Sequence, residues 1–151
     1  MDLGPNAPIA VWLWHTVQRM TRAFDELLAE HGGSRPVWHI LLALQSNTHA
    51  TQRDLAAEVG IREATLTHHL RAMEERGLII RYRAASNRRV QQIEVTPDGV
   101  ALFKELRKEA MAFDRQLRKV LGSEADVATF RDALDRIATA LDDGRPVPPL
   151  G

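Results

Sequence analysis

The chain of 151 residues contains no cysteine. This absence excludes disulfides, thiolate nucleophiles, cysteine-ligated zinc fingers and thiol-based redox sensing. Aromatic residues are scarce, at 5% of the chain. No apolar run approaches the roughly 18 residues of a membrane span, and the first residues lack a basic segment followed by a long apolar one. We therefore expect no membrane partner, no signal peptide and a cytoplasmic location.

An excess of charge of either sign is also lacking, since 20 basic residues balance 20 acidic ones. A neutral chain argues globally against binding to nucleic acid, but attraction to phosphate depends on the local patch. The segment 77–92 holds no acid and four arginines, namely Arg81, Arg83, Arg88 and Arg89. The neutral total therefore does not exclude a nucleic-acid binder.

Motifs of catalysis are missing as well. The chain has no Gly-rich phosphate loop, nucleophile elbow or zinc-protease helix motif, so we expect no enzyme, no catalytic residue and no cofactor. His68 and His69 are adjacent, but neighbouring side chains on a helix diverge and cannot chelate one ion. Arg71 occupies the position where a second ligand to His68 would stand, so we expect no metal site.

Helical periodicity dominates both ends of the chain. Apolar residues recur at alternating spacings of three and four in segments 8–31, 97–121 and 123–142, a pattern typical of helix bundles. Ser34 can cap a further helix that is apolar nearly all round, which predicts a buried position. The segment from Asp142 to Gly151 is too rich in proline and glycine to fold alone.

The middle of the chain predicts a helix-turn-helix followed by a hairpin. Thr51, with Asp54 three residues later, opens a short helix that ends at Gly60, and a second helix covers about 62–76. Segments 78–83 and 89–95 are rich in β-branched and aromatic residues and flank the turn residues Ser86 and Asn87. The fold class is mainly α with a small β-hairpin wing.

These elements predict one domain over 1–151. The winged helix-turn-helix would span 34–96, and 143–151 would be a flexible tail. Segments 8–31 and 97–142 would be dimerisation helices that bury their apolar stripes against a second copy. The alternative is that the stripes are buried within one chain.

One face of the helix over 62–76 suits a DNA major groove. With Leu66 facing the core, the opposite face presents small and polar residues, namely Ala64, Thr65, Thr67, His68 and Arg71. Threonine hydroxyls can bond phosphates or base edges, and histidine can donate to guanine. The alternative is a solvated helix face. His69 points toward the core side and is interpreted as a packing residue.

Arg88 and Arg89 at the tip of the hairpin complete this interpretation. A guanidinium at that position can reach phosphates or enter the minor groove. A surface charge that only aids solubility is the alternative. The helix and the wing together favour binding to DNA.

The order of elements resembles the MarR family of bacterial transcriptional regulators. The motifs that carry the resemblance are RDLAAEVGI, EATLTHHLRAMEERGLIIR and SNRRVQQIEVTPDG. The resemblance covers nearly the whole chain. It implies a homodimer that binds a palindromic operator in double-stranded DNA and often releases it when a small aromatic effector binds. Asn87 replaces the family's usual Asp, and His68 stands where an Arg is frequent.

The resemblance also implies an effector pocket where the first, second and fifth helices meet the winged unit. Residues available there are Trp12, Trp14, His15, Trp38 and His39, of which we select Trp12, His15, Trp38 and His39 as candidates. Aromatic rings could stack on a flat ligand, and a histidine could bind a carboxylate or phenolate. The alternative is that the tryptophans only fill the core.

We therefore expect a dimeric repressor that is released by an effector. Each protomer would place 65–71 in a major groove, with half-sites roughly 10 bp apart. The alternative function is a winged helix used only for contact with other proteins. Salt separates the two functions, because phosphate contacts make affinity fall steeply as salt rises.

Overall fold

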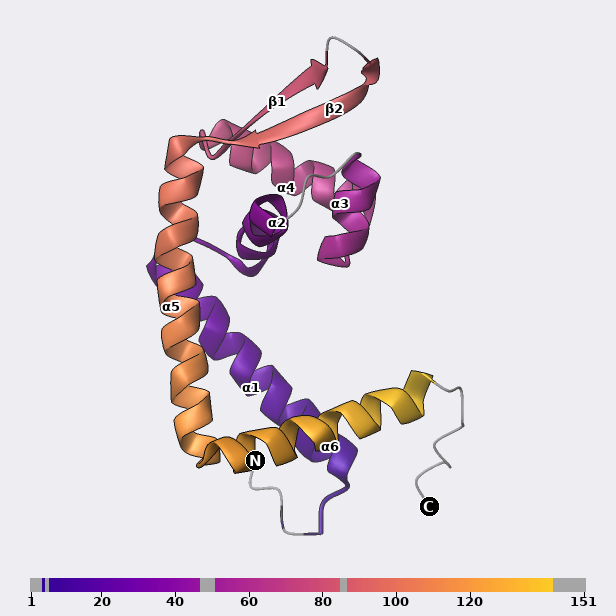
Figure 1. The fold of residues 1–151 in the computed structure, drawn as a ribbon, viewed down its shortest axis with the longest axis vertical. Helices are drawn as coiled ribbons and strands as arrows, with labels where there is room; N and C mark the ends of the chain where they lie inside the picture. The colour runs from indigo at the N-terminus through magenta and orange to yellow at the C-terminus, as the bar shows by residue number, and fades with distance from the viewer. Residues whose placement is uncertain (1–3, 5, 47–50, 85–86, 143–151) are drawn as a thin grey trace. The chain divides into compact units, whose positions relative to one another are not determined.

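A computed structural model describes residues 4, 6–46, 51–84 and 87–142 (Figure 1). It divides the chain into two units, Met1–Ala110 and Met111–Gly151. The elements, in order, are α1 (Ile9–Glu30), α2 (Arg35–Ser46), α3 (Gln52–Val59), α4 (Glu63–Glu75), β1 (Ile79–Ala84), β2 (Asn87–Val95), α5 (Pro97–Leu121) and α6 (Glu124–Asp142). The mainly helical class with one hairpin is confirmed. Within the described ranges, no helix is both long enough and apolar enough to span a membrane.

Side-chain caps fix where several helices begin, and the cap at Thr51 was predicted from the sequence. The Thr51 hydroxyl accepts a hydrogen bond from the Asp54 backbone N–H at 3.2 Å and opens α3. The Thr96 hydroxyl accepts from the Gly99 N–H at 3.1 Å at the start of α5. In α6, the Ser123 hydroxyl accepts from the Asp126 N–H at 3.3 Å. Each bond satisfies a first-turn donor that has no partner inside its helix, so local chemistry sets these boundaries.

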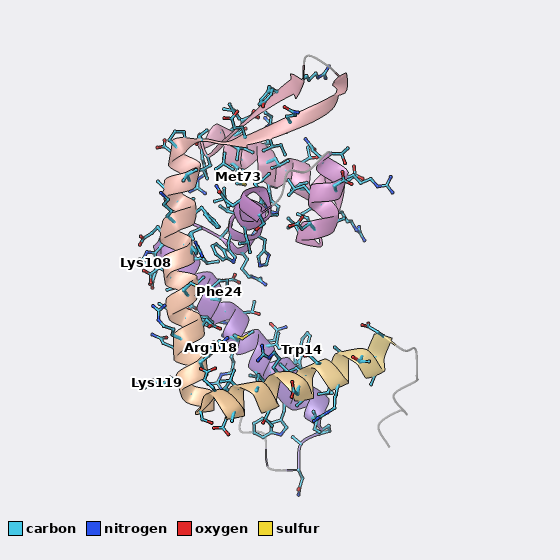
Figure 2. The ribbon with its side chains drawn as sticks, viewed as in Figure 1. Trp14, Phe24, Met73, Lys108, Arg118 and Lys119 are labelled. Atoms are coloured by element: carbon cyan, nitrogen blue, oxygen red, sulfur yellow. The ribbon has the colours of Figure 1, made fainter. Side chains whose placement is uncertain are left out.

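The core of the first unit lies among α2, α3, α4 and the base of the hairpin. Its fully buried side chains are apolar and come from all of these elements; the largest are Ile40, Leu41, Leu55, Leu66, Leu70, Met73 and Ile79. Met73 lies on the inner face of α4 (Figure 2). The helix-turn-helix is therefore held by its own core, which positions α4 as a rigid element.

The apolar helix at 35–46 is buried on one side only. Val37, Ile40, Leu41 and Ala43 are buried, whereas Leu42 is 40% exposed. A buried α2 was expected, and one side of the helix is buried in the core. The side that carries Leu42 is exposed to solvent in the single chain.

The hairpin has an irregular tip. The strands pair antiparallel in regular register from Ile79 opposite Val95 to Arg83 opposite Gln91, and then Ala84 pairs with Asn87. The register therefore shifts between Arg83 and Ala84, because β2 has more residues than β1 between these two pairs. Asn87 was predicted as a turn residue and is instead the first residue of β2.

The second unit consists of the end of α5 and of α6. Among the described residues of this unit, Val127 is the buried one, while the rest of the apolar stripe of α6 is largely exposed to solvent. The single domain predicted for 1–151 stays a prediction, and the tail predicted for 143–151 lies outside the described residues.

Candidate nucleic-acid interface

The helix α4 separates its core residues from its outer residues cleanly. Leu66, Leu70 and Met73 are buried, at 0%, 0% and 1% exposure. The five positions selected from the sequence are all exposed; these are Ala64, Thr65, Thr67, His68 and Arg71. One face of α4 thus anchors the helix and the other is available to a partner, as a groove-binding helix requires.

The two adjacent histidines occupy different environments. His68 is exposed, whereas His69 is half-buried. Their ring centroids are 5.8 Å apart and the planes are tilted by 59°, which is a tilted ring pair within contact range. This placement matches the interpretation of His69 as a packing residue, and it leaves only His68 on the outer face.

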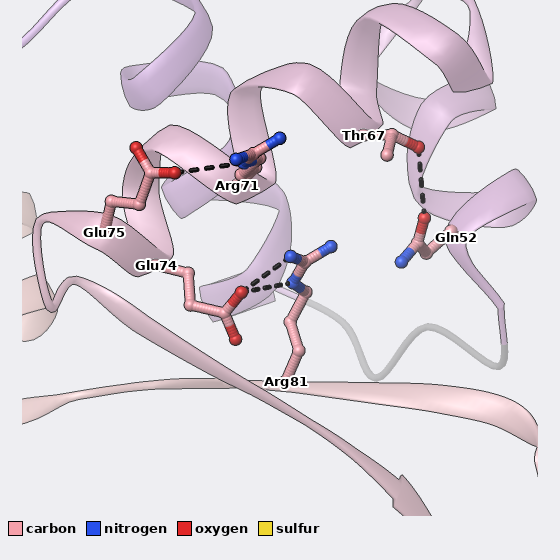
Figure 3. A network of polar contacts seen from close by, with 6 residues as sticks. All are labelled: Gln52, Thr67, Arg71, Glu74, Glu75 and Arg81. Atoms are coloured by element: carbon pink, nitrogen blue, oxygen red, sulfur yellow. Dashed lines mark hydrogen bonds and ion pairs between the residues drawn. The ribbon is translucent and has the colours of Figure 1, made fainter.

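The hydroxyl group of Thr67 is already engaged by its own helix. It donates to the Glu63 carbonyl oxygen at 2.9 Å. It also lies 3.5 Å from Gln52 Oε1 of α3, at the outer limit of a hydrogen bond (Figure 3). Because a hydroxyl carries one hydrogen, the Thr67 oxygen is left to accept from a DNA group, and a base amino group is the matching donor.

Arg71 has a partner on the same helix. Its Nε donates to Glu75 Oε1 at 3.0 Å, and both side chains are well exposed (Figure 3). An exposed pair at this spacing contributes only about 0.3–0.5 kcal/mol. A phosphate can therefore replace the Glu75 carboxylate as the partner of Arg71 at little energetic cost.

A second ion pair joins α4 to the wing. Arg81 of β1 donates from Nε and Nη2 to Glu74 Oε2, at 3.0 and 2.6 Å (Figure 3). The hydrogen bonds from Arg81 hold the pKa of Glu74 below its usual range. Arg81 was counted among the basic residues of the wing, but its charge is compensated here. Its role is to tie the hairpin to α4.

The wing arginines lie in the irregular part of β2. Arg88 and Arg89 follow Asn87, between the Ala84–Asn87 pair and the resumption of regular register at Gln91. A local excess of residues bends a strand and re-aims its side chains, and such irregularities are frequent beside functional sites. The side chains of Arg88 and Arg89 lie outside the described parts, so their contact with DNA stays a prediction.

The predicted effector residues are divided between two helices. Trp12, which is 44% exposed, and the half-buried His15 lie on α1, while Trp38 and the exposed His39 lie on α2. Trp38 stacks on Phe103 of α5, with ring centroids 5.6 Å apart and planes inclined by 17°. Trp12 precedes the end of α1 by 18 residues, or about 27 Å along the axis.

Two long-range contacts were missed by sequence reasoning. Arg76 at the end of α4 donates from Nη2 to the Gly32 carbonyl oxygen at 2.7 Å. His31 meets Glu105 and Glu109 of α5, and its Nδ1 lies 3.0 Å from Glu105 Oε1. Both contacts join residues more than 40 positions apart, so no local spacing could indicate them.

An exposed helix beside a basic hairpin, on a three-helix core, defines a winged helix-turn-helix protein. Comparison with known families agrees with this class. Residues 34–90 match the model of the MarR family. Over this segment the chain is similar to the MarR family, and the comparisons support a DNA-binding transcriptional regulator.

Individual relatives extend this likeness to most of the chain. The transcriptional regulator FarR of Neisseria gonorrhoeae is 25% identical over 139 residues, which is 86% of this chain and 95% of FarR. The organic hydroperoxide resistance regulator of Bacillus subtilis (strain 168) is 32% identical over 93 residues, which is 62% of this chain and 63% of that protein. Both names describe transcriptional regulators, and neither describes an enzyme or a module for protein contact alone.

A solved structure of the repressor CouR bound to a 23-mer DNA duplex is also similar. The TM-score is 0.76 at 25% identity, and the match covers 94% of this chain and 99% of CouR. CouR from Rhodococcus jostii RHA1 has also been solved with p-coumaroyl-CoA, and that structure matches with a TM-score of 0.69 at 23% identity over 99% of both chains.

Proposed function

We propose that the protein is a homodimeric repressor that binds a palindromic operator and leaves it when a small aromatic effector binds. The observation that carries the proposal is the division of α4 into a buried and an exposed face. The outer face offers a hydroxyl oxygen, an imidazole and a guanidinium within two turns, at Thr67, His68 and Arg71. These groups can form hydrogen bonds with base edges in a major groove. We propose that the protein binds its operator in the cytoplasm. The proposal includes no enzymatic step.

Exposed apolar side chains support the homodimer. On α6, Phe130, Leu134, Ile137 and Leu141 are between 37% and 58% exposed. On α1, Ile9 and Trp14 are 71% and 63% exposed. A helix that exposes an apolar stripe, as α6 does, is unusual on a monomer and typical of a self-association face. A symmetric dimer would place two α4 helices on two half-sites roughly 10 bp apart.

The proposed effector is a small aromatic molecule. CouR supplies the analogy, since its structures were solved with DNA and with p-coumaroyl-CoA. The Trp38–Phe103 stack shows that α2 and α5 already hold flat rings against each other, and the exposed His39 is the neighbour of Trp38. Because Trp12 and His15 lie far along α1, the four predicted residues do not come from one segment. We therefore assign the first contacts of the effector to Trp38 and His39.

A binding titration across salt concentrations tests the proposal. The DNA upstream of the protein's own gene is titrated with wild type and Arg89→Ala, and log affinity is plotted against log salt. We expect a steep linear fall for wild type. Arg89→Ala should weaken all sequences alike and make the slope shallower by about one unit per lost phosphate contact. Arg107→Ala, an exposed arginine on α5, serves as the matched control.

Two results would contradict the proposal. Absence of binding at low salt would favour the contact-only winged helix. A changed sequence preference in Arg89→Ala, with overall affinity intact, would reverse the division between affinity from the wing and selection from α4.

A further inference from the structure

Three metal-ligating side chains converge where α1 ends against α5. His31 is the last residue associated with α1, and Glu105 and Glu109 lie one turn apart on α5. His31 Nδ1 lies 3.0 Å from Glu105 Oε1, and Nε2 lies 3.9 Å from Glu109 Oε2. One ligand atom from each residue can be chosen so that all three lie within 4.8 Å of one another. All three residues belong to the first unit.

The spacing and the burial suit a bound ion. Zinc–ligand bonds of about 2.0–2.2 Å place two ligands of the same ion roughly 3–4 Å apart. The distance from His31 Nδ1 to Glu105 Oε1 lies in this range, whereas Glu109 lies nearest the other ring nitrogen, so side-chain rotation must bring one oxygen of Glu109 toward the nitrogen that ligates the ion. The side chains are 29% exposed for His31, 44% for Glu105 and 18% for Glu109. The cluster is thus partly shielded from water and still open to an entering ion.

We propose that His31, Glu105 and Glu109 form a binding site for a divalent transition-metal ion such as Zn²⁺. Imidazole nitrogen and carboxylate oxygen are the ligands that such ions take, and water would complete the coordination. One ring nitrogen of His31 ligates the ion, because the two nitrogens of an imidazole point away from each other.

Lys108 is the intrinsic competitor of the ion. Its Nζ lies 3.2 Å from Glu109 Oε1 and 3.7 Å from Glu105 Oε1. The Lys108 side chain is 69% exposed and lies on α5 (Figure 2), so it can leave the carboxylates when a divalent cation enters. Removal of this ammonium group should therefore strengthen metal binding.

The site is linked to α4 through the turn that follows His31. A Cβ added at Gly33 would lie 2.6 Å from Leu106 Cδ1, so this turn is packed closely on α5. The carbonyl oxygen of Gly32 accepts from Arg76, which ends α4. A metal ion bound to His31 would fix this turn next to Gly32, whose carbonyl oxygen accepts the bond from Arg76. Metal binding at the site should therefore change the affinity of α4 for DNA, and this consequence rests on the proposed function.

The test is a zinc titration of the full chain, free of any affinity tag, by calorimetry and by competition with a chromogenic chelator. We expect one Zn²⁺ per chain in wild type, and binding about tenfold weaker or worse in His31→Gln and in the Glu105→Gln, Glu109→Gln double variant. Glu30→Gln, an exposed acid next to His31, should bind as wild type does. Lys108→Gln should bind several-fold more tightly.

Equal zinc affinity in wild type, His31→Gln and the double variant would overturn the site, as would the absence of binding to wild type. Circular dichroism melts without zinc verify that each variant is folded. In a second arm, zinc should change the operator affinity of wild type but not of the double variant. Unchanged operator affinity despite zinc binding would overturn the link to α4. Absence of any DNA binding would instead overturn the proposed function and leave the metal site standing.

Discussion

At the scale of single residues, Thr67 shows how an internal hydrogen bond narrows recognition. Its hydroxyl hydrogen is directed to the Glu63 carbonyl oxygen, so only oxygen lone pairs face outward. A phosphate oxygen offers no hydrogen to them, whereas the amino groups of adenine and cytosine do. The sequence alone allowed either partner, and because of this internal hydrogen bond we predict a base.

The first prediction concerns the base preference set by Thr67. Thr67→Val keeps the shape and the methyl group but loses the accepting oxygen. We expect it to weaken discrimination at one base pair of each half-site by about 0.5–1.5 kcal/mol, the contribution of a single neutral hydrogen bond. The measurement is competition between operator fragments that differ at single positions. Thr67→Ser, which keeps the oxygen, should retain the wild-type preference; identical profiles for all three proteins would remove Thr67 from base recognition.

The second prediction concerns pH and the Glu74–Arg81 pair. Hydrogen bonding from Arg81 lowers the pKa of Glu74 in the folded protein, relative to the usual value of 4.5. A lowered folded pKa stabilises the fold above the unfolded value, and this contribution is lost as the pH falls through the folded value. Glu74→Gln should therefore be less stable than wild type at neutral pH, and the difference should shrink below pH 4.5.

Urea unfolding midpoints measured from pH 7 to about 3 check this expectation. Glu94→Gln, an exposed acid on β2, provides the matched control and should unfold in parallel with wild type. If the free energy of unfolding of wild type and of Glu74→Gln fell by the same amount as the pH is lowered, the Glu74–Arg81 pair would make no pH-dependent contribution to stability.

At the scale of elements, the start of α5 fits closely against the base of the hairpin. The Thr96 hydroxyl donates to the Gly77 carbonyl oxygen at 2.6 Å, and the Thr96 N–H donates to the Leu78 carbonyl oxygen at 3.0 Å. A Cβ added at Gly99 would lie 2.1 Å from that same Leu78 oxygen and 2.7 Å from Val95 Cγ1. No backbone atom tolerates such an approach, so the junction depends on a glycine.

The third prediction follows from this junction. Alanine is the better helix former by about 1 kcal/mol, yet Gly99→Ala should lower the free energy of unfolding by about 1–3 kcal/mol, because the start of α5 must move away from Leu78. The measurement is chemical denaturation, with Gly4→Ala as the control, since a Cβ at Gly4 meets nothing within 4 Å. Equal or greater stability of Gly99→Ala would show that α5 moves freely relative to the hairpin.

Elements whose signals are local were predicted well, and contacts between distant elements were not. The cap at Thr51 depends on Asp54, three positions away, and the sequence predicted it. The outer face of α4 followed from helical periodicity. The His31–Glu105 contact joins residues 74 positions apart, and only the folded chain brings them together.

Irregular backbone was the other feature beyond prediction. The register shift in the hairpin depends on how Ala84 and Asn87 pair, and alternating hydrophobicity carries no signal for such a shift. Arg88 and Arg89 were selected for their charge and their place near a turn. Their position on an irregular stretch of β2 became visible only in the structure.

At the scale of the whole molecule, the remaining question is what covers the apolar stripe of α6. Phe130, Leu134 and Ile137 are 45%, 37% and 38% exposed, although their spacing is that of a buried helix face. Apolar area contributes roughly 25 cal/mol per Å² when it leaves water. A second copy of the chain can supply the missing cover, and a palindromic operator needs two reading helices.

The last prediction joins the dimer to DNA binding. In sedimentation experiments, wild type should have about twice the 17.0 kDa mass of one chain, as expected for a dimer. Leu134→Glu places a charge in the apolar stripe, so this variant should have a lower mass. Arg136→Glu, on the opposite face of α6, changes charge without touching the stripe and should remain dimeric. Because two linked half-sites bind far more tightly than one, Leu134→Glu should also lose operator affinity while its α4 is unaltered. A variant that stays dimeric, or a monomer that binds the operator as tightly as wild type, would show that the stripe of α6 serves another purpose.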